Sequence, residues 1–87
     1  MTRRAVVVGT GHYLPERVVE NAEFEKTLDT SDEWIRARSG IERRHFATEG
    51  ETTSSMATAA AEAALKDAKL TADDIDAIVL ATSTADL

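Results

Sequence analysis

The segment that begins at Thr30 holds the side chains most suited to ligand binding. Trp34 and Arg38 are four positions apart, so on a helix they would share one face. An indole beside a guanidinium can hold a planar or phosphorylated ligand through stacking and charge-assisted hydrogen bonds. The same spacing suits a tryptophan that only anchors a short helix to the protein body, because tryptophans are mostly buried. Spacing alone favours the role of Trp34 as a helix anchor.

The same stretch concentrates positive charge. Residues 36–46 contain four arginines (Arg36, Arg38, Arg43 and Arg44) and one acidic residue, Glu42, in a chain whose net charge is −6. Such an island predicts contact with an anionic group on a small molecule or on a partner. The acidic balance of the whole chain argues against nucleic-acid binding.

Other catalytic and metal-binding motifs are absent from the sequence. The chain has no cysteine, which excludes disulfides, thiolate metal sites and a cysteine nucleophile within these 87 residues. Neither His12 nor His45 has a carboxylate at metal-ligand spacing, so we expect structural or exposed histidines and no metal site. The G-T-G stretch at residues 9–11 has Leu14 in place of a third glycine. It therefore predicts a tight turn rather than a dinucleotide site.

Two apolar runs predict the strands of the fold. Residues 5–8 and 77–81 are continuously apolar and rich in β-branched side chains, which is typical of parallel strands buried on both faces. No run approaches the roughly 20 apolar residues of a membrane-spanning helix, and no signal peptide develops. We therefore expect a cytoplasmic protein that does not bind membranes.

Three helices are predicted between these strands. Asn21 is a candidate N-cap for the first. Thr30 and Glu33 form a T-x-x-E capping box for a second, short helix that stops at Gly40. The third runs over residues 52–69, where abundant alanine favours a helix and also allows close packing against a sheet. Thr71 then caps a short turn.

The predicted order is strand, long connection, helix, strand, which forms a right-handed parallel crossover. Two strands and one covering helix do not complete such a sheet, because parallel sheets are normally buried on both faces. We therefore expect an α/β fold of which residues 1–87 are one segment.

Several motifs together resemble a known family. They are residues 9–15 (GTGHYLP), 29–35 (DTSDEWI) and 38–41 (RSGI), followed by Arg43, Arg44 and His45. In order and spacing they resemble the amino-terminal part of beta-ketoacyl-acyl-carrier-protein synthase III, a thiolase-fold condensing enzyme. The resemblance implies the layered αβαβα fold, with residues 1–87 as the N-terminal segment of its first half and the remainder outside this chain.

The resemblance implies an acyltransferase that initiates fatty acid biosynthesis. Such enzymes condense acetyl- or acyl-coenzyme A (CoA) with malonyl-acyl carrier protein, releasing carbon dioxide and forming 3-oxoacyl-acyl carrier protein. Their Cys–His–Asn constellation has no counterpart here, and neither His12 nor His45 matches it, so the segment alone is expected to be inactive. The implied partners are acyl-CoA, as substrate rather than cofactor, and malonyl-acyl carrier protein. The full-length protein is expected to form a homodimer.

The resemblance also assigns residues to ligand binding. Trp34 is similar to the tryptophan that stacks on the adenine of CoA, and Arg38 to the arginine beside it. Thr30 is similar to a threonine at the mouth of the same ligand-binding tunnel. This reverses the preference for Trp34 as an anchor. Arg43 and Arg44 either add positive potential at the mouth or belong to a solvated turn, and charge alone does not separate the two.

Two alternatives remain open from the sequence. One is a related condensing enzyme that uses CoA thioesters to make a quinolone or a polyketide starter. The other is a non-catalytic fragment that binds CoA or carrier protein.

Overall fold

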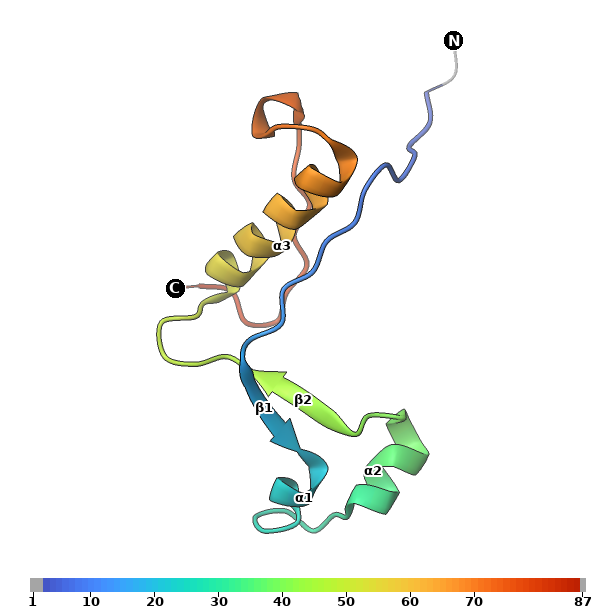
Figure 1. The fold of residues 1–87 in the computed structure, drawn as a ribbon, viewed down its shortest axis with the longest axis vertical. Coiled ribbons are helices and arrows are strands. Elements are labelled where there is room, and N and C mark those ends of the chain that lie inside the picture. Colours follow the sequence, from blue (N-terminus) through green and yellow to red (C-terminus); the bar gives the residue numbers. More distant parts are fainter. Residues whose placement is uncertain (1–2, 87) are drawn as a thin grey trace. The chain divides into compact units, whose positions relative to one another are not determined.

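The computed structural model describes residues 3–86 and divides the chain into two compact units (Figure 1). One unit is Leu14–Gly50, and the other combines the residues up to Tyr13 with those from Glu51 onward. We call the first the hairpin unit and the second the long-helix unit.

A two-stranded antiparallel sheet forms the frame of the hairpin unit. β1 (Arg17–Glu20) pairs with β2 (Arg43–Phe46), with Arg17 opposite Phe46 and Glu20 opposite Arg43. Alternation along β1 buries Val19, which is 3% exposed, while its neighbours stay open. The amino-acid sequence does not indicate this sheet, because the two strands carry few apolar residues and are separated by 22 residues of chain.

Two helices connect these strands. α1 (Asn21–Phe24) is a single turn, and α2 (Asp32–Ser39) ends at Gly40, whose φ of 74° is the left-handed conformation predicted for the stop. Ile35 from α2 joins Val19 in the small core, and the Phe24 and Phe46 rings lie 6.0 Å apart between centroids. The sheet and both helices thus share one core.

Two predicted caps in this unit are wrong. Ser31, not Thr30, caps α2, since its Oγ accepts a hydrogen bond from the Trp34 amide at 3.1 Å. Asn21 is the first residue of α1 rather than its cap, because its side chain is occupied by partners elsewhere in the unit.

The long-helix unit is organised by α3 (Thr53–Ala68), within one residue of the predicted helix. Thr52 and Ser55 form its capping box, and Lys69 ends it in the left-handed conformation, with φ of 59°. The short 3-10 helix η1 (Ala72–Asp74) follows, and the Thr71 amide donates to Asp74 Oδ2 at 2.9 Å. The predicted turn at Thr71 is confirmed.

Small residues bring an extended segment close to α3, as the alanine content predicted, although the segment is not part of a sheet. A Cβ added to Gly9 would lie 2.7 Å from Ala68 Cβ, and one added to Gly11 would overlap the Ala64 backbone. The Thr10 amide donates to Asp67 Oδ2 at 3.0 Å. Gly9 and Gly11 therefore permit an approach that no other residue type would allow.

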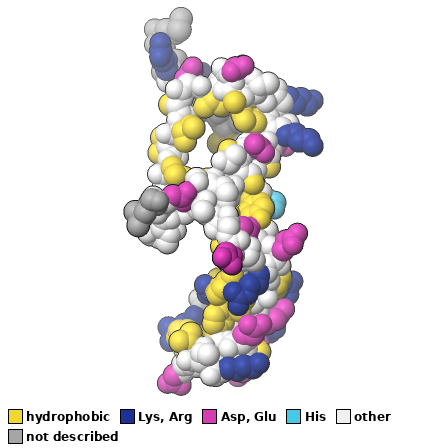
Figure 2. All heavy atoms as spheres, turned by 90° about the vertical axis from the view of Figure 1, so that its left-hand side faces the viewer, with side chains coloured by type: hydrophobic (Ala, Val, Ile, Leu, Met, Phe, Trp, Pro, Cys, Tyr) yellow, Lys and Arg dark blue, Asp and Glu magenta, His cyan; other side chains and the backbone are white. Residues whose placement is uncertain are grey.

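The two predicted parallel strands do not form. Residues 5–8 and 77–81 are extended but outside any ladder in the described part of the chain. Val7 is 82% exposed and Val79 97% exposed, and Figure 2 shows apolar side chains, in yellow, at the molecular surface. Apolar β-branched sequence favours an extended backbone, but a strand also needs a hydrogen-bonded neighbour. Among the described residues, no helix is long and apolar enough to cross a membrane.

Candidate ligand-binding site

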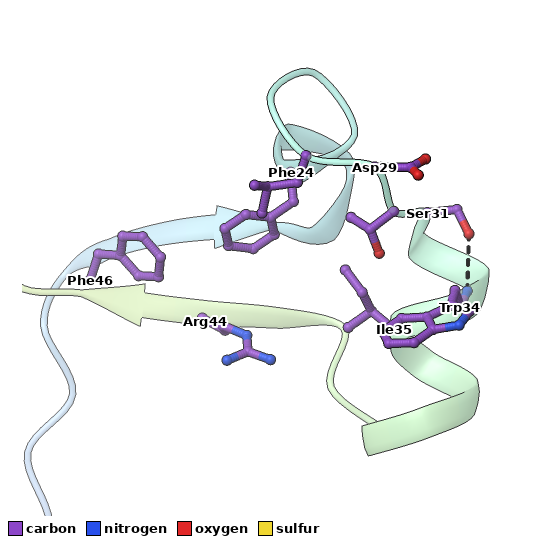
Figure 3. A pocket seen from close by; sticks show the side chains of 9 residues that line it. Phe24, Asp29, Ser31, Trp34, Ile35, Arg44 and Phe46 are labelled. Carbon is purple, nitrogen blue, oxygen red and sulfur yellow. Dashed lines mark hydrogen bonds between the residues drawn. The ribbon is translucent and has the colours of Figure 1, made fainter.

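An open depression of about 870 Å³ lies within the hairpin unit (Figure 3). Its walls come from α1, α2, β2 and the loop between the two helices. The lining residues are Phe24, Leu28, Asp29, Thr30, Ser31, Trp34, Ile35, Arg44 and Phe46. Aromatic and aliphatic groups with a few polar groups are the usual lining of small-molecule sites.

Trp34 presents its indole at this depression. The side chain lies on α2 and is 56% exposed, whereas the neighbouring Ile35 is 9% exposed and supplies the core contact. Trp34 is therefore not the anchor of the helix. An exposed indole at the edge of a depression is free to stack on a planar ligand.

Arg38 lies over the indole. Its Cζ is 5.3 Å from the centroid of the Trp34 ring, which is cation–π geometry. The predicted shared face of residues 34 and 38 is confirmed. Arg38 itself is not among the residues that line the depression.

Thr30 contributes an unsatisfied hydroxyl. Its Oγ1 is buried and has no hydrogen-bond partner among the described residues, although Thr30 lines the depression. Leaving a buried polar group unpaired costs about 1–3 kcal/mol. Because Ser31 caps α2 in its place, the Thr30 hydroxyl makes no capping hydrogen bond.

The four arginines predicted as one positive island have separate surroundings. Arg36 Nε lies 3.6 Å from Asp32 Oδ2, and Arg36 Nη2 lies 3.6 Å from Glu42 Oε1. Arg43 Nη1 lies 3.9 Å from Glu42 Oε2. Glu42, which the sequence showed only as a lone acidic residue, thus faces two of the four cations.

Arg44 differs from its neighbour Arg43. It lines the depression, and no carboxylate of the described residues lies within 4.0 Å of its guanidinium. Successive side chains of a strand point to opposite faces, so adjacent positions on β2 have different surroundings. Of the predicted pair, only Arg44 is placed to add positive charge to the depression.

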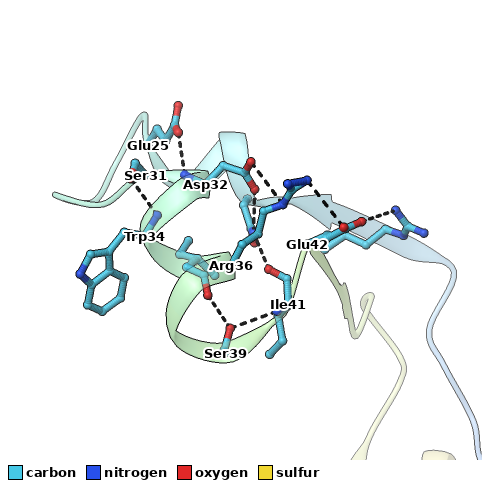
Figure 4. Close-up of polar contacts among 11 residues, drawn as sticks. Glu25, Ser31, Asp32, Trp34, Arg36, Ser39, Ile41 and Glu42 are labelled. Carbon is cyan, nitrogen blue, oxygen red and sulfur yellow. Dashed lines mark hydrogen bonds and ion pairs between the residues drawn. The ribbon is translucent and has the colours of Figure 1, made fainter.

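A polar network on the other side of α2 was missed by sequence reasoning (Figure 4). The Asp32 amide donates to Glu25 Oε1 at 2.8 Å, and Asp32 Oδ1 accepts from Asn21 Nδ2 at 3.0 Å. The Trp34 indole points away from these contacts. No sequence spacing indicates them, because the partners come from α1, the turn that follows it and α2.

The histidines take no part in the depression. His45 Nδ1 lies 2.6 Å from the Pro15 carbonyl oxygen, which is the structural role predicted. His12 is exposed and lies in the other unit. No cluster of three or more possible metal ligands occurs among residues 3–86.

Relatives of known name match the entire chain, although no family model does. Beta-ketoacyl-[acyl-carrier-protein] synthase III of Ruegeria sp. (strain TM1040) is 84% identical over 87 residues, and that of Ruegeria pomeroyi is 79% identical. Each match covers 100% of this chain and 27% of the relative.

Solved structures of the same kind share the fold. The 3-oxoacyl-[acyl-carrier-protein] synthase III of Aquifex aeolicus matches 79% of this chain and 22% of its own, with 51% identity and a TM-score of 0.71. The synthase III of Thermus thermophilus matches 71% of this chain and 19% of its own, with 50% identity and a TM-score of 0.62.

The fold places the chain in the class of thiolase-like α/β proteins, as an incomplete segment, which confirms the predicted fold class. Within that class, the whole chain matches the amino-terminal part of beta-ketoacyl-[acyl-carrier-protein] synthase III, which confirms the predicted resemblance. It spans about a quarter of its curated relatives, 27% of their length.

Proposed function

We propose that the hairpin unit forms the nucleotide-binding mouth of an initiating condensing enzyme of fatty acid biosynthesis. The enzyme would condense acyl-CoA with malonyl-acyl carrier protein to give 3-oxoacyl-acyl carrier protein and carbon dioxide. The observation that carries the proposal is the exposed Trp34 indole, with Arg38 over its ring, at the edge of an open depression.

Each site residue has a distinct role in this proposal. The Trp34 ring stacks on the adenine of CoA, and Arg38 supplies a planar cation beside it. Thr30 lines the same depression and contributes to its contact surface with the ligand. Arg44 adds positive potential that attracts the phosphates of the ligand.

The proposed role of these residues is to bind and orient substrate. The chain has no cysteine to accept an acyl group, and the family's catalytic histidine and asparagine are not matched within it. Holding the nucleotide end of a thioester lowers the entropic cost of bringing its acyl group to a nucleophile. Acyl transfer and decarboxylation are thus assigned to residues outside this chain, in a cytoplasmic homodimer.

Substitution of Trp34 in a full-length synthase that carries this sequence tests the proposal. Loss of base stacking costs about 1–3 kcal/mol, so Trp34→Ala should lower kcat/KM for acyl-CoA roughly 5- to 150-fold. A truncated thioester that keeps the acyl and phosphopantetheine portions but lacks the adenine nucleotide should react as before.

Two further variants sharpen this test. Trp34→Phe keeps an aromatic face and should retain most of the preference for acyl-CoA. Arg38→Lys should lose part of it, because an ammonium does not reproduce the planar guanidinium. Unchanged use of acyl-CoA by the Trp34→Ala enzyme would refute the nucleotide-binding role.

A further inference from the structure

Asn21 is the most deeply buried polar side chain described for the hairpin unit, with 1% exposure. Its Nδ2 donates to Asp32 Oδ1 at 3.0 Å and to the Ile41 carbonyl oxygen at 2.6 Å. Its backbone amide donates to the Glu42 carbonyl oxygen at 3.2 Å. One residue of α1 therefore contacts both ends of α2.

These contacts restrain how α2 is oriented. Asp32 is the first residue of α2, and Ile41 follows the Gly40 stop at its other end. A helix held at both ends on one side cannot rotate about its axis without breaking a buried hydrogen bond. Its rotation determines where the opposite side of the helix, with Trp34, faces (Figure 4).

The side chain is not explained by packing alone. Asn21 Oδ1 is buried and has no hydrogen-bond partner among the described residues, which is unfavourable for stability. An apolar residue would fill the same space without that cost. The part of the amide group that makes contacts is its nitrogen, which donates to Asp32 and Ile41.

We propose that Asn21 is a positioning residue for the nucleotide-binding platform, acting through Asp32 and Ile41 on the orientation of Trp34. This inference rests on the proposed function of Trp34. Asn21 lies outside the lining of the depression, so its effect on the ligand is indirect. The ligand class it serves is an adenine nucleotide linked to a thioester.

The test compares acyl-CoA with the truncated thioester that lacks the nucleotide, in a full-length synthase that carries this sequence. Asn21→Asp preserves shape but directs an oxygen at Asp32 Oδ1 and at the Ile41 carbonyl. We expect KM for acyl-CoA to rise at least tenfold relative to KM for the truncated thioester, with kcat for the truncated thioester unchanged.

Two variants supply matched controls. Asp32→Asn keeps an oxygen that can accept from Asn21, so its ratio of the two KM values should stay near wild type. The double variant Asn21→Asp with Asp32→Asn restores a donor–acceptor pair in the reverse direction, and it should recover several-fold of the lost preference. If Asn21→Asp does not fold, Asn21→Ala removes the donor without adding charge and should shift the same ratio.

The outcomes separate this inference from the proposed function. If Trp34→Ala shifts the ratio but the folded Asn21 variants do not, or if they impair both thioesters equally, the positioning role is overturned. If Trp34→Ala itself leaves the ratio unchanged, the nucleotide-binding role fails first. The positioning role is supported if Trp34→Ala and the Asn21 variants each shift the ratio of the two KM values and the double variant recovers it.

Discussion

The hairpin unit and the long-helix unit are held together in different ways. In the hairpin unit, contacts between distant residues dominate: a sheet register, a buried asparagine and an aromatic pair. In the long-helix unit, the main element is a helix whose capping box and left-handed stop lie within or next to its own sequence. Sequence patterns therefore predict the long helix better than they predict the contacts of the hairpin unit.

We expect the greatest loss of stability where the glycine segment packs against α3 in the long-helix unit. Gly11→Val places a branched side chain against the Ala64 backbone, and backbone cannot move aside as a flexible side chain can. Overpacking of this kind costs about 1–3 kcal/mol or more. We expect a lower melting temperature for this chain in far-ultraviolet circular dichroism, with loss of α3 signal.

The hairpin unit supplies an internal control for the Gly11→Val measurement. The chain has one tryptophan, in the hairpin unit, so its fluorescence reports that unit separately. Emission from Trp34 should be unaltered in the Gly11→Val chain at temperatures where the helix signal falls. Simultaneous loss of both signals would show that the two units unfold together.

A smaller effect is expected from Arg44, which tests the hairpin unit. Arg44→Gln removes a cation that lines the depression, and Arg43→Gln removes one that faces Glu42. An exposed charge pair contributes up to about 1 kcal/mol, so Arg44→Gln should weaken CoA binding roughly fivefold at low salt. Isothermal titration of the full-length synthase measures this loss, which salt should diminish.

Arg43→Gln is the matched control for this measurement. It removes the same charge one residue away, and we expect CoA affinity to change little. Equal losses in the two variants would mean that the arginines act only through general positive potential.

The smallest effect concerns a carboxylate in the long-helix unit. A hydrogen bond from the Ser54 hydroxyl, with further hydrogen bonds from the start of α3, lowers the pKa of Asp86 below its ordinary value of 3.8. Because the folded pKa lies below the unfolded one, the contact stabilises the fold above pH 3.8 and is lost as pH falls through the folded pKa.

Replacement of one serine removes the main cause of this shift. Ser54→Ala should raise the pKa of Asp86 toward 3.8 in a carboxyl titration followed by nuclear magnetic resonance. Ser55→Ala removes a capping hydrogen bond from Thr52 instead and should leave that pKa where it is. A low Asp86 pKa in the Ser54→Ala chain would exclude the hydroxyl as the cause.

Helix α3 and the stop at Gly40 were predictable because their causes are local. Alanine content, a threonine cap and a glycine each act within a few positions of the structure that they specify. The cap of α2 was mispredicted because Thr30 and Ser31 are both suitable types. Only the Ser31–Trp34 hydrogen bond distinguishes them.

The remaining features depend on residues far apart in the chain. The pairing of β1 with β2 is not indicated by any alternation of apolar and polar residues in the sequence. Conversely, residues 5–8 and 77–81 have the composition of strands but pair with no other strand in the described part of the chain. By contrast, the i, i+4 spacing of Trp34 and Arg38 is local, and it predicted their contact. The separation of Arg43 from Arg44 depended on which face of β2 each occupies.

The contact of His45 with Pro15 has a consequence for the tautomer of the imidazole. A carbonyl oxygen only accepts, so the ring must carry its hydrogen on Nδ1 to make this bond. In the neutral ring Nε2 then carries no hydrogen and can only accept. The contact between Pro15 and strand β2 therefore fixes the tautomer of the neutral ring, with Nε2 left as its hydrogen-bond acceptor.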